Sequence, residues 1–262
     1  MSTRPERDIP CHFGPDHGLF GIYHPGASGV KEAVLLCPPL GQDLIRSHRL
    51  YRQLAHALAG LGFAVLRFDY YGTGDSAGLS EEVEWPRCLA DVSDAAAQLR
   101  ARSGCERIIG FGARLGGSLA LAAADRAQLD ELVLWDPVLD GAAHVAALNA
   151  LQAALRFDTN RFLAPRPADL LADQWQGFAI DICLRQQLAD LYLDPPRRRT
   201  LLLLSGAADP SADHHRFAAT GADLATLAQP TPWNDLEHLE TAIQSHQLID
   251  IVSRRVQEAV HA

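Results

Sequence analysis

A glycine-bounded segment carries the most distinctive chemistry in this sequence. The segment is GFGARLGG (residues 110–117), and Arg114 stands at its centre, after an apolar run and before a helix-forming run. A guanidinium stays protonated at accessible pH and has no lone pair to offer, which excludes Arg114 as a nucleophile. It can hold a carboxylate or phosphate through two parallel hydrogen bonds, and a helix starting near Leu115 would add free amides and a dipole. The segment therefore predicts an anion or oxyanion site at Arg114.

A structural role for Arg114 is the alternative. An unpaired buried charge is expensive, so we expect the guanidinium to have a partner. Three carboxylates that follow apolar runs could brace it: Asp69, Asp136 and Asp209. The sequence leaves open whether the partner is one of these or a ligand.

Other residues could supply a nucleophile. Ser118 lies four residues after Arg114, one helical turn deeper, where we expect it to pack against the sheet. Ser76 follows a glycine-rich turn, where serine commonly closes a local hydrogen bond. Cys37 ends an apolar run, and we expect a buried structural thiol there.

No spacing in the sequence indicates a metal or cofactor site. The five cysteines (11, 37, 88, 105 and 183) are scattered and form no C-x-x-C pair, which favours a reducing cytoplasm. His214 and His215 are too close-set for a helical metal motif, and His48 and His144 belong to no paired motif. We therefore predict no metal and no cofactor.

The length, composition and net charge limit the classes of molecule that this protein could bind. At 262 residues and 48% hydrophobic, the chain can bury one sizeable core. A net charge of −9 with dispersed basic residues argues against nucleic acid and anionic membranes. The first residues have no apolar signal-peptide core, and no run approaches the ~18 apolar residues of a membrane span. We expect a cytoplasmic protein with a small-molecule ligand, and the sequence does not indicate an oligomeric state.

The chain alternates buried strands with amphipathic helices. Helical spacing is clear at His48–Leu61 and Trp85–Arg102. The predicted strands are Ala33–Cys37, Ala64–Phe68, Arg107–Phe111, Glu131–Trp135 and Thr200–Ser205. Strands that alternate with helices predict an α/β fold with a mostly parallel central sheet flanked by helices. Ligands then bind at the carboxyl ends of the strands.

The alternation of predicted strands and helices stops between residues 139 and 196. This stretch becomes helical and mixes tryptophan, phenylalanine, leucine and glutamine, which indicates a cap inserted into a core formed by residues 1–138 and 197–262. Trp175 and Phe178 either line an acyl or aromatic pocket or attach the cap to the core.

Four segments resemble the α/β-hydrolase superfamily. In order they are Cys37-Pro38-Pro39-Leu40-Gly41, the run from Phe68 to Ser76, Gly112 to Gly117, and Gly206-Ala207-Ala208-Asp209. The resemblance implies an α/β-hydrolase fold over nearly the whole chain. The pairing of G-x-R-L-G-G with LVLWDPVLDG (132–141) more narrowly resembles the exosortase A system-associated hydrolases of the second type.

The resemblance also implies site residues. The superfamily places a nucleophilic serine in a G-x-S-x-G elbow, where this chain has Arg114, followed along the chain by an acid and a histidine. Asp209 matches the acid and His238 the histidine, although Trp233 and Glu237 compete for that place and His238 could equally be a surface residue beside carboxylates. Backbone amides of Leu40 or Gly41 and of Leu115 match the oxyanion hole, and Asp136 lies at a strand end among the binding residues.

Two main functions follow. The first is a serine-less enzyme that acts on an acyl or carboxylated small molecule, with Asp209 orienting His238 as a general base and Arg114 at the anion or oxyanion site. It would hydrolyse esters or thioesters or carry out a lyase or cyclase step. The second is an inactive pseudo-hydrolase that binds an acyl or acidic metabolite or a protein partner. Catalysis by a displaced nucleophile is a third possibility.

Overall fold

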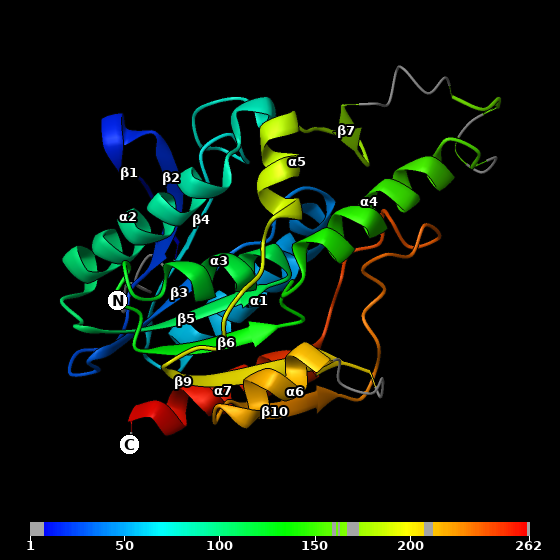
Figure 1. The fold of residues 1–262 in the computed structure, drawn as a ribbon. Coiled ribbons are helices and arrows are strands. Elements are labelled where there is room, and N and C mark those ends of the chain that lie inside the picture. Colours follow the sequence, from blue (N-terminus) through cyan, green and yellow to red (C-terminus); the bar gives the residue numbers. More distant parts are fainter. Residues whose placement is uncertain (1–7, 159–160, 162, 167–172, 207–211, 261–262) are drawn as a thin grey trace.

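A central sheet organises the computed structural model, which describes residues 8–158, 161, 163–166, 173–206 and 212–260 (Figure 1). Its strand order is β1-β2-β4-β3-β5-β6-β9-β10. The strands are β1 (Ile9–Phe13), β2 (Leu19–His24), β3 (Glu32–Cys37), β4 (Ala64–Phe68), β5 (Arg107–Ala113), β6 (Glu131–Trp135), β9 (Arg199–Ser205) and β10 (Asp223–Leu227). Only the β1–β2 and β2–β4 pairs are antiparallel, so the sheet is mostly parallel, as predicted.

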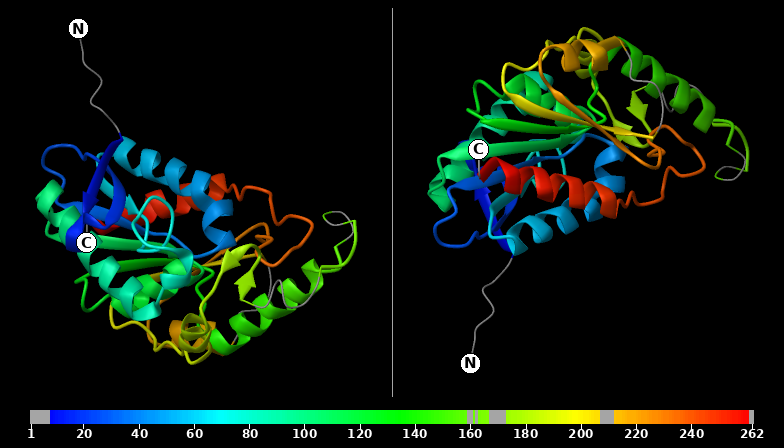
Figure 2. Two further views of the ribbon diagram at one scale, coloured as in Figure 1. Left: turned by 90° about the horizontal axis from the view of Figure 1, so that it is seen from above. Right: turned by 90° about the horizontal axis from the view of Figure 1, so that it is seen from below.

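Helices cover both faces of the sheet. They are α1 (Gln42–Gly60), α2 (Trp85–Ser103), α3 (Leu115–Ala123), α4 (Gly141–Leu155), α5 (Ile182–Ala189), α6 (Ala212–Ala219) and α7 (His246–Val260), with short 3-10 turns at Pro15–His17 and Ser80–Glu82. On one face α1 and α7 lie side by side (Figure 2), and on the other α2 and α3 pack. Because helices cover both faces, β3 is buried along its whole length.

The predicted strands are all present. β4 and β6 have the predicted bounds, and the other three are longer by one or two residues. Helix α1 begins six residues before the predicted start, because Gly41 (φ 61°) ends the preceding loop and lets the polar residues Gln42 and Asp43 form the first turn. The β1–β2 hairpin and β10 were not predicted, since these strands alternate buried and exposed positions or are largely exposed.

The segment between β6 and β9 is less helical than expected. It holds α4 and α5, which pack on each other, and between them a short hairpin of β7 (Gln174–Trp175) and β8 (Phe178–Ala179) (Figure 1). A Cβ at Gly141 would collide with the Leu188 carbonyl oxygen, so this glycine permits α4 to begin against α5. The cap boundaries 139 and 196 remain a prediction.

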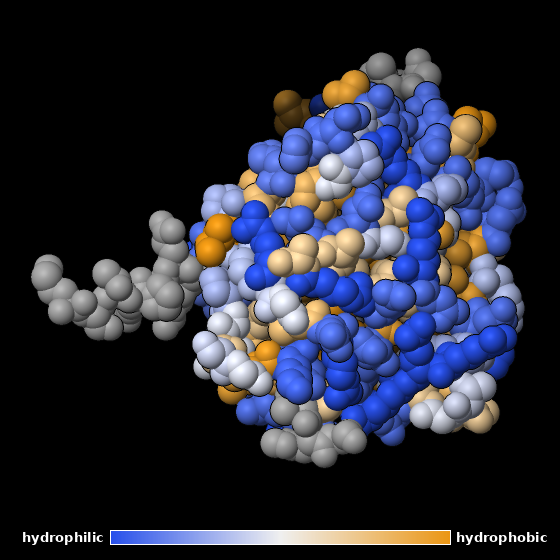
Figure 3. All heavy atoms as spheres, turned by 90° about the vertical axis from the view of Figure 1, so that its left-hand side faces the viewer, coloured by the Kyte–Doolittle hydropathy of each residue, from blue (hydrophilic) through white to orange (hydrophobic). Residues whose placement is uncertain are grey.

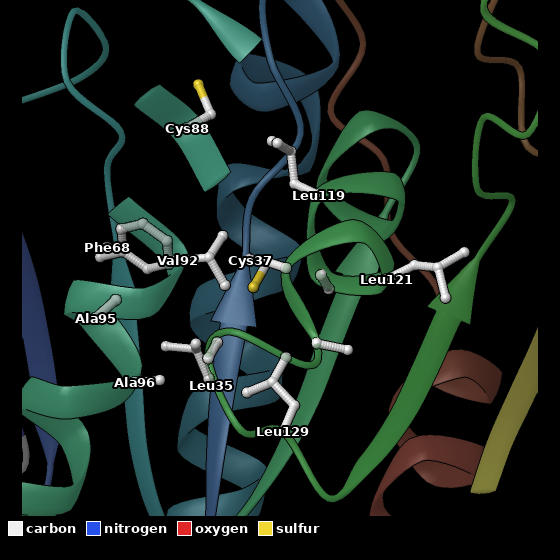
Figure 4. Packing of buried hydrophobic residues seen from close by; sticks show 14 of the residues in the cluster. Leu35, Cys37, Phe68, Cys88, Val92, Ala95, Ala96, Leu119, Leu121 and Leu129 are labelled. Carbon is white, nitrogen blue, oxygen red and sulfur yellow. The ribbon is translucent and has the colours of Figure 1, made fainter. Parts of the chain in front are cut away.

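The core contains four of the five free cysteines. Figure 4 shows Cys37 of β3 among apolar side chains that include Val92 of α2 and Leu35. Burial raises the pKa of the Cys37 thiol far above its ordinary value, so Cys37 is not a reactive thiolate. Among the described residues, no helix has the length and apolar character needed to cross a membrane.

Candidate functional site

The turn between β5 and α3 has the geometry of a strained elbow. Arg114 adopts φ 51° and ψ −130°, a region that costs a non-glycine residue about 1–3 kcal/mol. Glycines on either side make the turn possible. A Cβ at Gly112 would lie 2.4 Å from the Gly116 carbonyl oxygen, and one at Gly116 would lie 2.3 Å from that of Pro38. The glycine spacing is therefore required by packing, whatever residue stands at position 114.

Tyr51 of α1 ties the elbow to the neighbouring strand end. Its buried hydroxyl donates to the Cys37 carbonyl oxygen at 2.9 Å and accepts from the Ala113 amide at 2.9 Å. Burial raises the pKa of Tyr51 well above its usual value, so the hydroxyl keeps its proton and both bonds. The ends of β3 and β5 are thus held side by side.

Arg114 pairs with a carboxylate that is not among the three predicted from the sequence. Its Nε lies 3.2 Å from Asp43 Oδ2, and its guanidinium carbon lies 5.5 Å from the centre of the Trp233 ring. Both charged side chains are mostly covered, at 13% and 16% exposed. Within the described part of the chain, the two Nη groups donate to no residue. Neither Asp69 nor Asp136 pairs with Arg114, and Asp209 lies outside the described residues.

Asp136, at the end of β6, belongs to a partly buried hydrogen-bond network. Its Oδ2 accepts the Trp233 indole N–H at 2.7 Å and the Ser205 hydroxyl, and its Oδ1 accepts the Ser205 amide at 2.8 Å. The Trp135 indole donates to the Ser205 hydroxyl oxygen at 2.9 Å. Asp136 is therefore a hydrogen-bonded structural carboxylate with an indole ring as its partner.

Helix α1 positions the loop that carries Trp233. The buried Arg46 guanidinium donates to the carbonyl oxygens of Trp233 at 2.9 Å and Pro232 at 2.7 Å. Gln42 donates to Leu239 O at 2.7 Å, and the Ile243 amide donates to Arg46 O at 2.8 Å. The path of this loop thus depends on contacts about 190 residues apart in sequence.

His238 has a partner within its own loop. Its Nδ1 lies 2.7 Å from Asp235 Oδ2, with the two side chains 49% and 40% exposed. Asp235 is therefore one carboxylate that can orient the His238 ring. Because Asp209 lies outside the described residues, the Asp209–His238 pair stays a prediction. Trp233, in the same loop, donates its indole N–H to Asp136 at the end of β6.

A cavity, the elbow pocket, brings five predicted binding residues together. Its lining includes Leu40, Gly41, Leu115, Trp175 and Phe178, together with Asp43, His144, Leu148 and Leu184. A second, larger cavity shares Leu40, Gly41, Phe178, Ile180 and Leu184 and extends over Gly72 to Gly74 and Val83. The two cavities adjoin and are mainly apolar.

Two polar residues that line the elbow pocket, Asp43 and His144, were not predicted from the sequence. Burial raises the pKa of the Asp43 carboxyl, and the nearby Arg114 charge offsets part of that rise. Burial, with a smaller contribution from the Arg114 charge, lowers the pKa of His144 to about 3, so its ring is neutral near pH 7. Asp43 could have been found from its place after Gly41 in a strand-end loop; His144 has no comparable sequence signal.

The alternative serine nucleophiles serve local structure. Ser118 is fully buried, and its hydroxyl donates to the Val138 carbonyl oxygen at 2.6 Å. The Ser76 hydroxyl donates to Asp69 O at 2.6 Å and accepts from the Phe20 amide at 2.9 Å. Each is engaged as predicted for a structural serine.

Comparisons with known proteins agree with this architecture. Residues 31–173, more than half of the chain, match the serine aminopeptidase, S33 family. Uncharacterized proteins MT2364 and Rv2307c of Mycobacterium tuberculosis are each 37% identical over 134 residues, which cover 50% of this chain and 45% of theirs. The match therefore spans about half the length of these relatives.

Solved structures share the fold at low identity. An esterase of Pyrococcus furiosus aligns with a TM-score of 0.64 and 14% identity, covering 97% of this chain and 89% of that one. A proline iminopeptidase-related protein of Thermus thermophilus aligns with a TM-score of 0.60 and 18% identity, covering 97% of this chain and 99% of that one. Alpha/beta hydrolase domain-containing protein 10 of mouse aligns with a TM-score of 0.59 and 16% identity, covering 96% of this chain and 99% of that one. Family and fold together support a hydrolase-type function. The chain belongs to the serine aminopeptidase, S33 family and has the α/β-hydrolase fold.

Proposed function

We propose that this chain binds an acyl small molecule in the elbow pocket and forms no acyl-enzyme at residue 114. The observation that carries the proposal is the contact between Trp233 and Asp136 beside Arg114. In a serine hydrolase, those three places would be taken by a base, its orienting acid and the nucleophile. An indole cannot accept a proton from a nucleophile, and a guanidinium cannot attack a carbonyl.

The pocket supports an acyl ligand. Its walls are apolar side chains from α4, α5 and the β7–β8 hairpin, with Trp175 fixed by a 2.8 Å bond from its indole to Asn149. Its inner end has the amides of Gly41 and Leu115, at the start of α1 and of α3, where helix geometry leaves N–H groups for a ligand. A carbonyl oxygen facing these amides and an acyl chain along the wall would match both features.

Arg114 acts mainly through Asp43 in this proposal. Asp43 lines the pocket and needs a cation because it is largely buried. The resulting ion pair favours a neutral carbonyl head over a second carboxylate. The anion-binding role predicted from the sequence would instead favour a ligand with a carboxylate. The charge of the preferred ligand therefore distinguishes the two roles.

The finer family resemblance belongs to the same proposal. G-x-R-L-G-G and LVLWDPVLDG resemble the exosortase A system-associated hydrolases of the second type, in which the elbow serine is likewise missing. We propose that Arg114 marks that subgroup, and that residues 139–196 serve as the cap that closes the pocket.

Binding of octanoate and methyl octanoate tests the proposal by calorimetry and by the fluorescence of Trp175. Leu148→Trp should fill the pocket and weaken binding of the ester at least about tenfold, equivalent to roughly 1.4 kcal/mol. Ala146→Trp, on the exposed face of the same helix, should leave binding unchanged. Equal affinity of both variants for the ester would show that the ester does not bind in this pocket.

The charge comparison uses the same two ligands. The proposal expects the ester to bind at least as tightly as the acid. A preference for octanoate that Arg114→Ala abolishes, in a variant with wild-type circular dichroism and melting temperature, would instead assign Arg114 to ligand-anion binding.

Hydrolysis by activated water is a second candidate, favoured by the 2.7 Å contact between His238 and Asp235. An oriented imidazole contributes about 10²–10⁴ in rate when it acts as a general base. Turnover of octanoyl thioesters and 4-nitrophenyl octanoate by wild type, with a loss of about 100-fold in folded His238→Ala, would establish this candidate. Turnover that His238→Ala leaves intact would exclude His238 as the base.

A further inference from the structure

A second cluster lies at the antiparallel edge of the sheet. Asp8 directly precedes β1, His24 ends β2, and His56 lies on α1. The pairing of Ile9 with Tyr23 brings Asp8 next to His24 on the neighbouring strand. Helix α1 packs against β2, which brings His56 to the same place. Three residues far apart in sequence therefore meet where the β1–β2 hairpin joins the helical layer.

The contact atoms of these residues are close together. Asp8 Oδ1 lies 3.2 Å from His24 Nδ1 and 3.2 Å from His56 Nε2. The two imidazole rings lie 5.2 Å apart, and one ligand atom from each residue falls within 4.8 Å of the other two. The His24 side chain is 1% exposed, and those of Asp8 and His56 are each 34% exposed.

Hydrogen bonding does not account for these short contacts. Asp8 Oδ1 and His56 Nε2 are buried atoms, yet neither has a hydrogen-bond partner among the described residues, because their 3.2 Å approaches lack hydrogen-bond geometry. Buried polar atoms are normally satisfied, so a site that gathers such atoms calls for a partner. Two imidazole nitrogens and one carboxylate oxygen are ligands that Zn²⁺ and other divalent transition metals favour.

We propose that Asp8, His24 and His56 form a binding site for a divalent transition-metal ion such as Zn²⁺. Adjacent ligands of a four-coordinate Zn²⁺ lie about 3.3 Å apart, given metal–ligand bonds of about 2.0–2.1 Å. The two contacts with Asp8 already have that spacing, and the partly exposed His56 side chain can rotate to close the remaining separation. The Arg67 guanidinium also lies near Asp8, and the charges of Asp69 and Arg52 act on Arg67 as well.

The position of the site indicates a structural role. The ion would join the edge hairpin β1–β2 to α1, adding a cross-link between elements that otherwise meet through few contacts. The face that carries β1, β2 and α2 is largely hydrophilic with only small apolar patches (Figure 3). A metal cross-link would therefore add to the stability that this edge gains from its buried apolar residues.

Zinc titration of the chelator-treated full chain tests the site. Calorimetry should give one equivalent of Zn²⁺ bound to wild type, and melting should show a higher Tm with Zn²⁺. His56→Ala and Asp8→Asn should weaken Zn²⁺ binding by more than the roughly 10–100-fold typical of losing an outer-shell partner of a metal ligand. His48→Ala is the matched control, since it removes an exposed histidine from the same helix and should bind Zn²⁺ as wild type does.

The outcomes separate cleanly because neither test variant removes the fully buried His24. Loss of the bound equivalent in both test variants, with His48→Ala unchanged, supports the site. Absence of a stoichiometric equivalent in wild type, or equal binding in all variants, overturns it. The visible absorption spectrum of the Co²⁺-loaded chain should change in His56→Ala. This spectrum gives a measurement independent of calorimetry and melting.

Discussion

Two ring–carboxylate pairs lie in or beside the same loop and differ in what surrounds them. The Trp233 indole nitrogen lies 2.7 Å from Asp136, and the His238 imidazole nitrogen lies 2.7 Å from Asp235. The first pair lies at a strand end next to the elbow, with Trp233 buried and Asp136 partly buried, and its residues lie 97 positions apart. The second is about half exposed and joins residues three apart. The ring able to accept a proton thus stands on the surface, whereas the ring beside the elbow cannot accept one.

Conversion of the buried pair should have the largest effect. Because Asp136 already accepts a ring N–H at 2.7 Å, a histidine at position 233 should find its orienting carboxylate in place. We expect the Arg114→Ser, Trp233→His double variant to hydrolyse 4-nitrophenyl octanoate at least about 100-fold faster than either single variant. A fluorophosphonate should label residue 114 in the double variant alone. A folded double variant without this gain would show that Trp233 does not occupy the position of a catalytic base.

His144 extends the comparison to a buried ring that can titrate. Burial lowers its folded pKa to about 3, against an ordinary value near 6.5. As pH falls below about 6.5, the unfolded chain takes up the proton first, so stability is lost between about pH 6.5 and 3. From pH 7.5 to 4.5, His144 should contribute a loss of about 2–3 kcal/mol. Urea unfolding at both pH values should show a smaller loss for His144→Gln, and an equal loss would contradict a neutral buried ring.

Removal of the indole donor tests the strength of the buried pair. Trp233→Phe keeps most of the apolar ring but leaves Asp136 without one of its donors. A hydrogen bond to a charged group contributes about 1.5–3 kcal/mol, so we expect a loss of stability of that size in urea unfolding near pH 7. A change below about 0.5 kcal/mol would show that Ser205 alone satisfies the carboxylate.

The exposed pair should give the smallest effect. His238→Ala should lower the free energy of unfolding by only a small fraction of the loss in Trp233→Phe, because exposed ion pairs contribute little. The same urea assay, run on both variants side by side, checks this directly. A loss equal to that of Trp233→Phe would remove the contrast between the two pairs.

The elements were predictable because their signals are local. Continuous apolar runs gave the parallel strands, and helical spacing gave α1 and α2. The hairpin β7–β8 interrupts a segment expected to be helical, since its few residues are held by their contacts with each other and with the helices beside them. Leu40, Gly41, Leu115, Trp175 and Phe178, which the sequence predicts as binding residues, line one cavity, and their role in binding stays a prediction.

The pairing of side chains was not predictable to the same degree. The sequence offered Asp69, Asp136 and Asp209 as partners of Arg114, whereas Asp43 holds that place. It also left His238, Trp233 and Glu237 open for the position near the acid. Arg46 and Gln42 of α1 hold the loop in which Trp233 meets Asp136. No spacing linked Asp8, His24 and His56, which meet only through strand register and helix packing.

The sequence by itself therefore determined the α/β layering and the glycine-bounded elbow with Arg114 at its centre. Burial and backbone geometry act on neighbouring residues, so their pattern can be read along the chain. Only the tertiary structure decided which ring meets which carboxylate and which charge neutralises Arg114. Those contacts depend on the paths of loops held by residues far away in the sequence, and local periodicity does not encode such distances.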